Sequence, residues 1–129
     1  MFRVEHTEQY GRGIYANRLI LKDELIDASE LLVCNKKDTQ LVRQTLLYYY
    51  VYALNDEKDA VVLSPFSLIN HSLDSNVLYK VVDLGNRKVM HFIATRDIQV
   101  DEQLFINYYD DYEQLNIDEY LQFKYDEDA

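Results

Sequence analysis

The sequence predicts one domain of mainly β structure with short helices. Its 129 residues, 48% of them hydrophobic, suit a single core but are too few for two domains of ordinary size. The apolar residues fall in short stretches between turn-forming residues, a pattern typical of strands. Three glycines and one proline punctuate the chain, and no linker, repeat or low-complexity tract interrupts it. We therefore expect residues 1–129 to form one β-rich unit.

Strands are predicted wherever apolar residues alternate with polar ones or form a short continuous run. In chain order these are residues 2–5, 14–16, 25–27, 30–34, 60–63, 77–83, 88–94 and 104–108. Gly11 to Gly13 and Asp23-Glu24 are expected to be turns between strands. Residues 77–94 are expected to form an antiparallel hairpin around Gly85-Asn86.

Helices are predicted at four places. Asp38 or Thr39 is a candidate N-cap for a short helix that runs to about Thr45. The apolar residues 46–54 are interpreted as a buried helix that turns into a strand, followed by a solvated loop. Ser64 before Pro65 predicts an N-cap with proline at the first helical position. The spacing of apolar residues after Asp110 allows a short amphipathic helix.

Charge is distributed unevenly along the chain. The net charge is −10, from 13 basic and 23 acidic side chains. Residues 1–96 carry 12 of each, whereas residues 97–129 carry 11 acids and one base. Such a chain repels phosphate groups, which argues against nucleic acid or an anionic membrane as its main partner. A basic protein or peptide fits better.

The single cysteine, Cys34, excludes an internal disulfide and a cysteine-based zinc site, so we expect no metal. The first residues include Arg3 and Glu5 and lack the apolar centre of a signal peptide. We therefore expect an intracellular protein, cytoplasmic or nuclear. If the protein comes from a virus or an intracellular bacterium, the host nucleus is one of the expected locations.

Three short motifs are candidates for chemistry, although each alone fits an ordinary turn. Gly11-Arg12-Gly13 either turns the chain or lets a cofactor approach the backbone, because glycine has no Cβ. Asn70-His71-Ser72 either forms a hydrogen-bonded turn or supplies polar groups to a site. Asp101 and Glu102 are neighbours that would point to opposite faces of an extended chain, so we expect them to be solvated.

In this order, the three motifs resemble those of the SET-domain protein lysine methyltransferases. Residues 11–16 look like the family's glycine motif, residues 69–72 with Asn76 like its Asn-His-Ser motif, and residues 101–108 like its final Glu-Leu-to-Tyr motif. The resemblance covers about residues 2–112 and is to the minimal, single-domain type found in viruses and bacteria. Residues 113–129 would then be an acidic C-terminal tail or a lid.

The resemblance implies a β-clip fold of small sheets with a pseudoknot, in which the C-terminal segment threads beneath a preceding loop. It implies S-adenosylmethionine as the methyl donor, S-adenosylhomocysteine as the product, and no metal. The cofactor would be bound by residues of the motifs, namely Gly11, Arg12, Gly13, Tyr15, Asn70, His71 and Tyr108.

Two tyrosines are assigned catalytic roles by the resemblance. Tyr108, at the family's invariant tyrosine position, would aim its hydroxyl at the reacting methyl and amine. Tyr79 matches a second channel tyrosine of some members, with an aromatic on a hairpin face as the alternative. Tyr50 is a channel candidate for which a core position is the alternative. The expected substrate channel comprises Tyr50, Tyr79, Ile106, Tyr109 and Tyr112.

The chain departs from the family pattern in each of its later motifs. Leu73 and Ser75 replace Cys and Pro in the loop after Ser72, so this loop loses a rigid residue. The family's Gly-Glu-Glu-Leu is Asp101-Glu102-Gln103-Leu104 in this chain. Tyr109 stands where the family often has Gly, which alters the expected shape of the lysine channel.

The expected function is S-adenosylmethionine-dependent methylation of lysine side chains in a basic protein, such as a histone or histone-like tail. The alternative is a non-catalytic acidic module that binds basic peptides. The aromatic content leaves a homodimer open, although the sequence identifies no interface for one.

Overall fold

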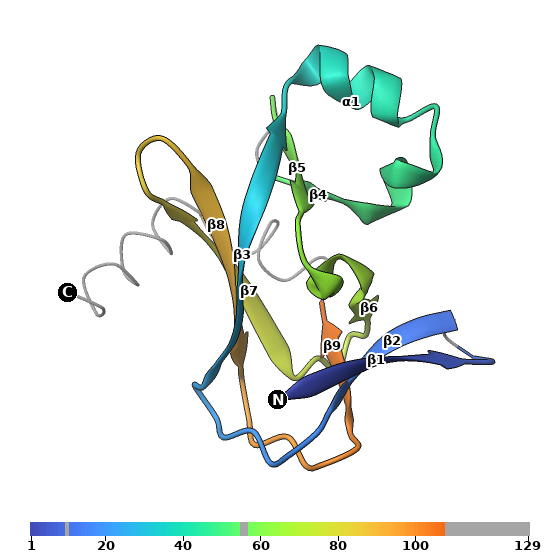
Figure 1. The fold of residues 1–129 in the computed structure, drawn as a ribbon, viewed down its shortest axis with the longest axis vertical. Coiled ribbons are helices and arrows are strands. Elements are labelled where there is room, and N and C mark those ends of the chain that lie inside the picture. The colour runs from blue at the N-terminus through green and yellow to red at the C-terminus, as the bar shows by residue number, and fades with distance from the viewer. Residues whose placement is uncertain (10, 55–56, 108–129) are drawn as a thin grey trace.

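The computed structural model of the chain describes residues 1–9, 11–54 and 57–107. Its strands form a four-stranded sheet in the order β1-β2-β9-β6 and a five-stranded sheet in the order β4-β5-β3-β8-β7 (Figure 1). The strands are β1 (Phe2–Thr7), β2 (Gly11–Ala16), β3 (Leu25–Cys34), β4 (Val51–Ala53), β5 (Asp59–Val62), β6 (Asn70–His71), β7 (Val77–Asp83), β8 (Lys88–Ala94) and β9 (Gln103–Ile106). The predicted class, mainly β with short helices, is confirmed.

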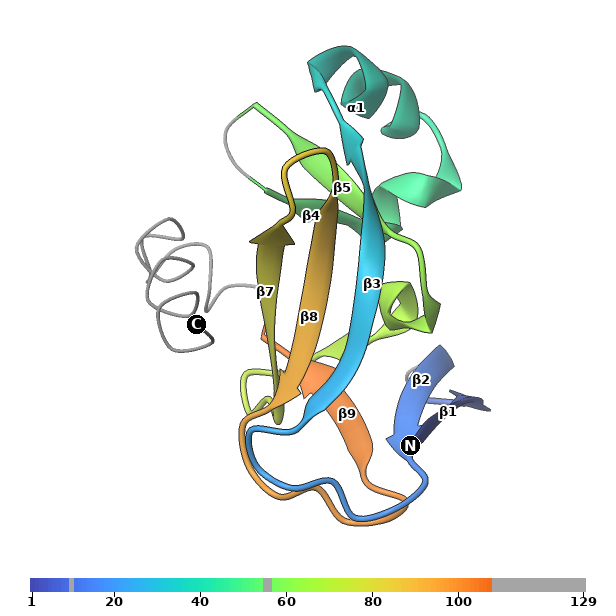
Figure 2. The same ribbon diagram turned by 60° about the vertical axis from the view of Figure 1, so that its left-hand side comes forward.

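In the five-stranded sheet, β3 lies between β5 and β8 (Figure 2). The β7–β8 hairpin pairs without interruption from Val77↔Ala94 to Asp83↔Lys88, as its alternation predicts. The prediction of two strands between residues 25 and 34 is wrong, because β3 continues through Ser29. The Ser29 side chain is buried and its hydroxyl donates to Ser64 at 2.6 Å, so a polar residue is accommodated within the strand.

The four-stranded sheet combines segments that are far apart in the sequence. β1 and β2 form an antiparallel hairpin, and β9 pairs antiparallel with β2 and parallel with β6. The prediction of a turn at Gly11 to Gly13 is wrong, since these residues belong to β2. Gly11 opens the strand with a φ of 66°, a conformation that glycine adopts readily.

Short helices connect the strands in the described part of the chain. They are α1 (Lys36–Val42), η1 (Leu46–Tyr50) and η2 (Pro65–Leu68). The predicted N-cap of α1 is wrong, because Asn35 caps the helix and Asp38 completes a capping box with it. The predicted change from helix to strand near residue 50 and the N-cap at Ser64 are confirmed. The prediction that the helical part of residues 46–54 is buried is wrong, because Leu46, Leu47 and Tyr48 of η1 are exposed.

None of these helices is long and apolar enough to cross a membrane, within the described ranges. The helix predicted after Asp110 lies outside the described residues.

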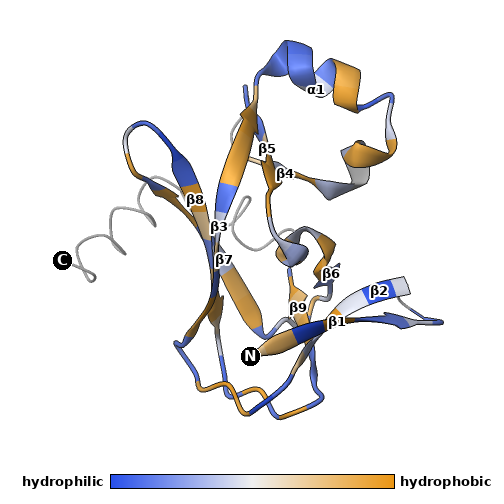
Figure 3. Cartoon of the chain, in the orientation of Figure 1, coloured by the Kyte–Doolittle hydropathy of each residue, from blue (hydrophilic) through white to orange (hydrophobic). Residues whose placement is uncertain are grey.

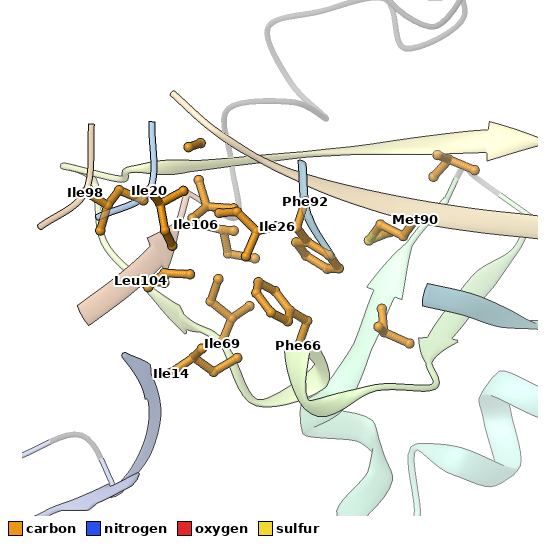
Figure 4. Packing of buried hydrophobic residues seen from close by; sticks show 14 of the residues in the cluster. Ile14, Ile20, Ile26, Phe66, Ile69, Met90, Phe92, Ile98, Leu104 and Ile106 are labelled. Carbon is orange, nitrogen blue, oxygen red and sulfur yellow. The ribbon is translucent and has the colours of Figure 1, made fainter. Parts of the chain in front are cut away.

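The two sheets share one hydrophobic core with η2 (Figure 4). Phe66 of η2 packs against Phe92 of β8 and Phe2 of β1, with ring centroids 4.5 and 4.8 Å apart. Phe66 and Phe92 are fully buried, and burial of such a ring stabilises the fold by about 1.5–3 kcal/mol. Apolar residues dominate β9 and the end of β3 that leads to α1 (Figure 3). The core thus holds η2 and β9 in fixed positions next to β6.

Candidate functional site

The sheet β1-β2-β9-β6 has an apolar face and a polar face. Ile14 and Leu104 pair across β2 and β9, and both are fully buried in the core. Side chains alternate along a strand, so the next pair, Tyr15 and Gln103, points to the opposite side. Asn70 of β6 reaches Gln103 on that side. We call this the polar face, and it comprises Gly13, Tyr15, Asn70 and Gln103.

Asn70 joins β6 to the rest of the polar face through its amide nitrogen. Nδ2 donates to the Arg12 carbonyl at 3.0 Å and to Gln103 Oε1 at 3.0 Å. A peptide carbonyl can only accept, so the bond to Arg12 determines which end of the Asn70 amide faces β2. Asn70 Oδ1 receives no hydrogen bond from the described residues. This oxygen can therefore accept from a ligand.

Gly13 lies where the backbone of β2 comes closest to these side chains. A Cβ atom at Gly13 would lie 2.6 Å from Gln103 Oε1 and 3.2 Å from Asn70 Nδ2. The first separation is shorter than real Cβ contacts, so any larger residue would displace the Gln103 amide. Gly11 differs, because no atom lies within 4 Å of its Cβ position.

Gln103 extends the hydrogen bonds of the polar face to Tyr15. Its Nε2 donates to the Tyr15 hydroxyl at 3.2 Å, and the Arg3 guanidinium lies 5.7 Å from the centre of the Tyr15 ring. Gln103 and Arg3 are residues that the sequence analysis did not assign to the site. Gln103 is recognisable in the sequence only as a departure from the family's Glu.

Asn76 links the second motif to the third from inside the protein. Its side chain is 1% exposed, and its Nδ2 donates to Glu102 Oε2 at 3.1 Å and to the Gln103 carbonyl at 2.8 Å. Its Oδ1 accepts from the Phe105 N–H at 2.8 Å. Leaving one of these buried groups without a partner would cost about 1–3 kcal/mol. Asn76 therefore fixes the position of β9.

The prediction that Glu102 is solvated is correct only in part, because its side chain is 30% exposed. Its carboxylate accepts from Arg96 at 2.7 Å, from Asn76 at 3.1 Å and from the Gln99 backbone N–H at 3.3 Å. Partial burial acts to raise the pKa of Glu102, but the hydrogen bonds from Arg96, Asn76 and Gln99 outweigh it and lower the pKa. Glu102 is therefore ionised at neutral pH and stabilises the turn before β9.

Asp101 occupies the position of the family's glycine with a φ of 69°, in the left-handed region. Asp tolerates this conformation better than most residues, so the turn is retained. The predicted solvation of Asp101 is confirmed, since its side chain is 73% exposed. It forms an ion pair with Arg3 at 2.9 Å, which ties the turn to β1.

The other predicted site residues lie around the same sheet. Arg12 Nη2 donates to the Tyr50 hydroxyl at 3.3 Å, so η1 reaches β2. Tyr79 is partly buried against the core, with its ring centroid 5.5 Å from that of Tyr52. His71 pairs with Ile106 in the parallel β6–β9 ladder, and the Ile106 side chain is fully buried.

The roles expected of these residues in the cofactor site and the channel stay predictions. The structure does not describe three of the predicted site residues, Tyr108, Tyr109 and Tyr112, or the C-terminal segment 113–129.

Comparisons with known proteins agree with one another. A family model described as the SET domain matches residues 11–109. The chain is 30% identical over 108 residues to the Schizosaccharomyces pombe "Histone-lysine N-methyltransferase, H3 lysine-37 specific", covering 83% of this chain and 72% of that protein. It is 26% identical over 116 residues to the Dictyostelium discoideum "Histone-lysine N-methyltransferase set1", covering 82% of this chain but 8% of that protein.

Among solved structures, CpSET8 from Cryptosporidium is similar with a TM-score of 0.70 at 23% sequence identity. The match covers 88% of this chain and 59% of that chain. At this level of identity the likeness concerns the fold.

Proposed function

Because this chain belongs to the SET-domain family, we propose that it is an S-adenosylmethionine-dependent methyltransferase that acts on lysine side chains of a basic protein. The observation that carries the proposal is the meeting of the three motifs on one sheet. Arg12 and Asn70 are 58 residues apart in the chain, yet they are joined by a hydrogen bond. Residues that served only as local turns would not need this convergence.

The polar face has the features that a cofactor with an amino-acid end requires. The lack of a Cβ at Gly13 lets the Gln103 and Asn70 amides lie against the backbone of β2, and Asn70 Oδ1 is an acceptor suited to an ammonium group. The backbone of Arg12 and Gly13 and the side chain of Asn70 would hold the methionyl part, and the backbone of His71 the adenine. When bound, S-adenosylmethionine supplies a methyl group activated on a sulfonium. The residues of the polar face therefore fit this cofactor.

The residues of the chain have two tasks in this reaction, orientation and desolvation. Tyr108 follows β9 by two residues in the sequence and would orient the reacting groups through its hydroxyl. A tyrosine with an ordinary pKa of about 10 is mostly protonated at neutral pH, so it acts as a hydrogen-bond donor rather than a base. The channel residues Tyr50, Tyr79, Ile106, Tyr109 and Tyr112 would exclude water, which favours the neutral form of the target lysine.

The proposed substrate is a basic segment such as a histone or histone-like tail. Two curated relatives carry names that describe histone-lysine N-methyltransferases. The acidic segment of residues 97–129 suits a cationic substrate, because attraction between opposite charges accelerates association. In this proposal, residues 2–112 form the catalytic unit and residues 113–129 an acidic tail or lid.

Mass spectrometry of methyl transfer tests the proposal directly. The protein is incubated with isotopically labelled S-adenosylmethionine and either histones or a mixture of basic proteins. We expect labelled lysines with the wild type, and Tyr108→Phe should lower the rate by about 100-fold or more, the usual effect of removing a positioned donor. Tyr48→Phe removes a hydroxyl from an exposed tyrosine of η1 and should leave the rate unchanged.

Two outcomes of this experiment would contradict the proposal. Undiminished transfer by Tyr108→Phe would exclude the assigned role of Tyr108. Peptide binding by a wild type that neither binds S-adenosylmethionine nor transfers methyl groups would favour the non-catalytic binding module instead.

A further inference from the structure

We propose that Gln103 is a positioning residue of the cofactor site, whose uncharged amide sets the direction of the hydrogen bonds that Asn70 and Tyr15 offer to the cofactor. The proposal rests on the function proposed above. It concerns a position where this chain departs from the family's Glu.

The Arg12 carbonyl determines the direction of these hydrogen bonds, because a carbonyl oxygen can only accept. Asn70 must therefore turn Nδ2 towards β2, and the same Nδ2 donates to Gln103. Gln103 must in turn present Oε1 to Asn70, which leaves its Nε2 for Tyr15. The Tyr15 hydroxyl accepts this bond, so its own hydrogen is directed away from Gln103.

The polar face thus offers a ligand one acceptor and one donor. The acceptor is Asn70 Oδ1 and the donor is the Tyr15 hydroxyl, and neither is used by a described residue. The amino-acid end of S-adenosylmethionine carries an ammonium group that donates and a carboxylate that accepts, so this pair complements both charges. The match depends on a side chain at position 103 whose terminal group has both an acceptor and a donor.

A carboxylate at position 103 would change this arrangement. It has no donor, so it would accept from Asn70 and from Tyr15 alike. The Tyr15 hydrogen would then be used within the protein and would be lost to the cofactor. A protonated carboxyl group, by contrast, has one acceptor and one donor and would restore the pattern of the amide.

Other charged and titratable groups lie on the strands of this sheet and must be separated from the effect of Gln103. They are Arg3, Glu5 and His6 of β1, Arg12 and Tyr15 of β2, His71 of β6, and Glu102, which precedes Gln103. Arg3 is bonded to Glu5 at 2.7 Å, and Glu102 to Arg96 at 2.7 Å. These groups remain in every variant at position 103. Their titration therefore cancels when a variant is compared with the wild type at the same pH.

Calorimetry with S-adenosylmethionine between pH 8 and pH 4 tests the proposal. At pH 7 to 8, Gln103→Glu should bind the cofactor about tenfold more weakly or worse, the value of one hydrogen bond to a charged group. The deficit should persist to pH 5 and shrink only below it, as the new carboxyl group, whose ordinary pKa is about 4.3, takes up a proton. Gln103→Met removes both bonds and should bind weakly at every pH. Gln40→Glu, an exposed position on α1, makes the same charge change and should bind like the wild type.

A double-mutant cycle with Tyr15→Phe gives an independent measurement. Tyr15→Phe removes the donor and should itself weaken binding several-fold at every pH. In this background Gln103→Glu should cost much less than in the wild type, because no hydroxyl hydrogen remains to be misdirected. Thermal melts of each variant verify folding, and if Gln103→Glu fails to fold, Tyr15→Phe and Gln103→Met decide the question.

The outcomes separate this proposal from the proposed function. If the wild type does not bind S-adenosylmethionine, the proposed function fails. If the wild type binds, but Gln103→Glu and Tyr15→Phe bind equally well at all pH values, the positioning role of Gln103 is overturned. The same holds if the penalty of Gln103→Glu is unchanged in the Tyr15→Phe background.

Discussion

Single atoms decide the geometry of the polar face, and Gly13 is the clearest case. Its backbone does not require glycine, because its φ is not in the left-handed region. The restriction comes instead from the Gln103 amide, only 2.6 Å from the position of a Cβ. A substitution at Gly13 therefore disturbs the site rather than the strand.

We expect Gly13→Ala to fold and to bind S-adenosylmethionine about tenfold more weakly, because the added methyl displaces the Gln103 and Asn70 amides. Gly85→Ala is the matched control. Gly85 has a φ of 90° with no atom near its Cβ position, so alanine there should lower stability by about 1–2 kcal/mol and leave cofactor affinity unchanged. Calorimetry and urea unfolding measure both effects. Equal affinity of Gly13→Ala and the wild type would argue against the polar face as the cofactor site.

At the level of secondary structure, local elements were predictable and non-local ones were not. The β7–β8 hairpin has its own alternation and its own turn, and the Ser64-Pro65 cap is a local signal. β6 has only two residues, too few for any periodicity, and its pairing with β9 depends on the whole fold. The contact of Glu102 with the buried Asn76 was missed for the same reason, because Asn76 lies 26 residues away in the sequence.

The site could therefore be predicted only as three motifs in order. Their meeting on one face, and the inclusion of Gln103, follow from the position of β9 between β2 and β6. Periodicity describes a single strand and carries no information about which distant strand lies beside it.

The element η2 packs against β2 of the polar face, and Ser64 holds η2 in place. The Ser64 hydroxyl accepts from the Phe66 N–H at 3.1 Å and donates to Asp27 at 3.0 Å, while Ser29 donates to it. Ser64→Ala removes the cap of η2 and the hydrogen bonds of Ser64 with Asp27 and Ser29, so we expect a loss of about 2 kcal/mol or more in the free energy of unfolding.

Asn35→Ala is the comparison for Ser64→Ala, since it removes only the cap of α1 and should cost about 1 kcal/mol. Urea unfolding measures both values. A smaller loss for Ser64→Ala than for Asn35→Ala would show that the Ser64 hydrogen bonds contribute little beyond the cap.

Across the whole molecule, the net charge of −10 is concentrated in residues 97–129. Removal of residues 118–129 deletes five acids and one base. If this segment attracts a basic substrate, the truncated protein should bind a lysine-rich peptide more weakly at low salt, and its affinity should depend less on salt. Peptide affinity measured from low to physiological ionic strength provides the test, with S-adenosylmethionine affinity as the control. An unchanged salt dependence would indicate a segment that only increases solubility.

The position of β9 in the middle of its sheet also determines when the molecule becomes complete. β2 and β6 have no direct pairing, and both depend on a strand that begins at Gln103. During synthesis, the β1–β2 hairpin and η2 emerge from the ribosome long before the strand that joins them. Closing such long loops makes folding slow, because their entropy is lost before the contacts form. The nascent chain therefore has no assembled polar face until β9 has been made.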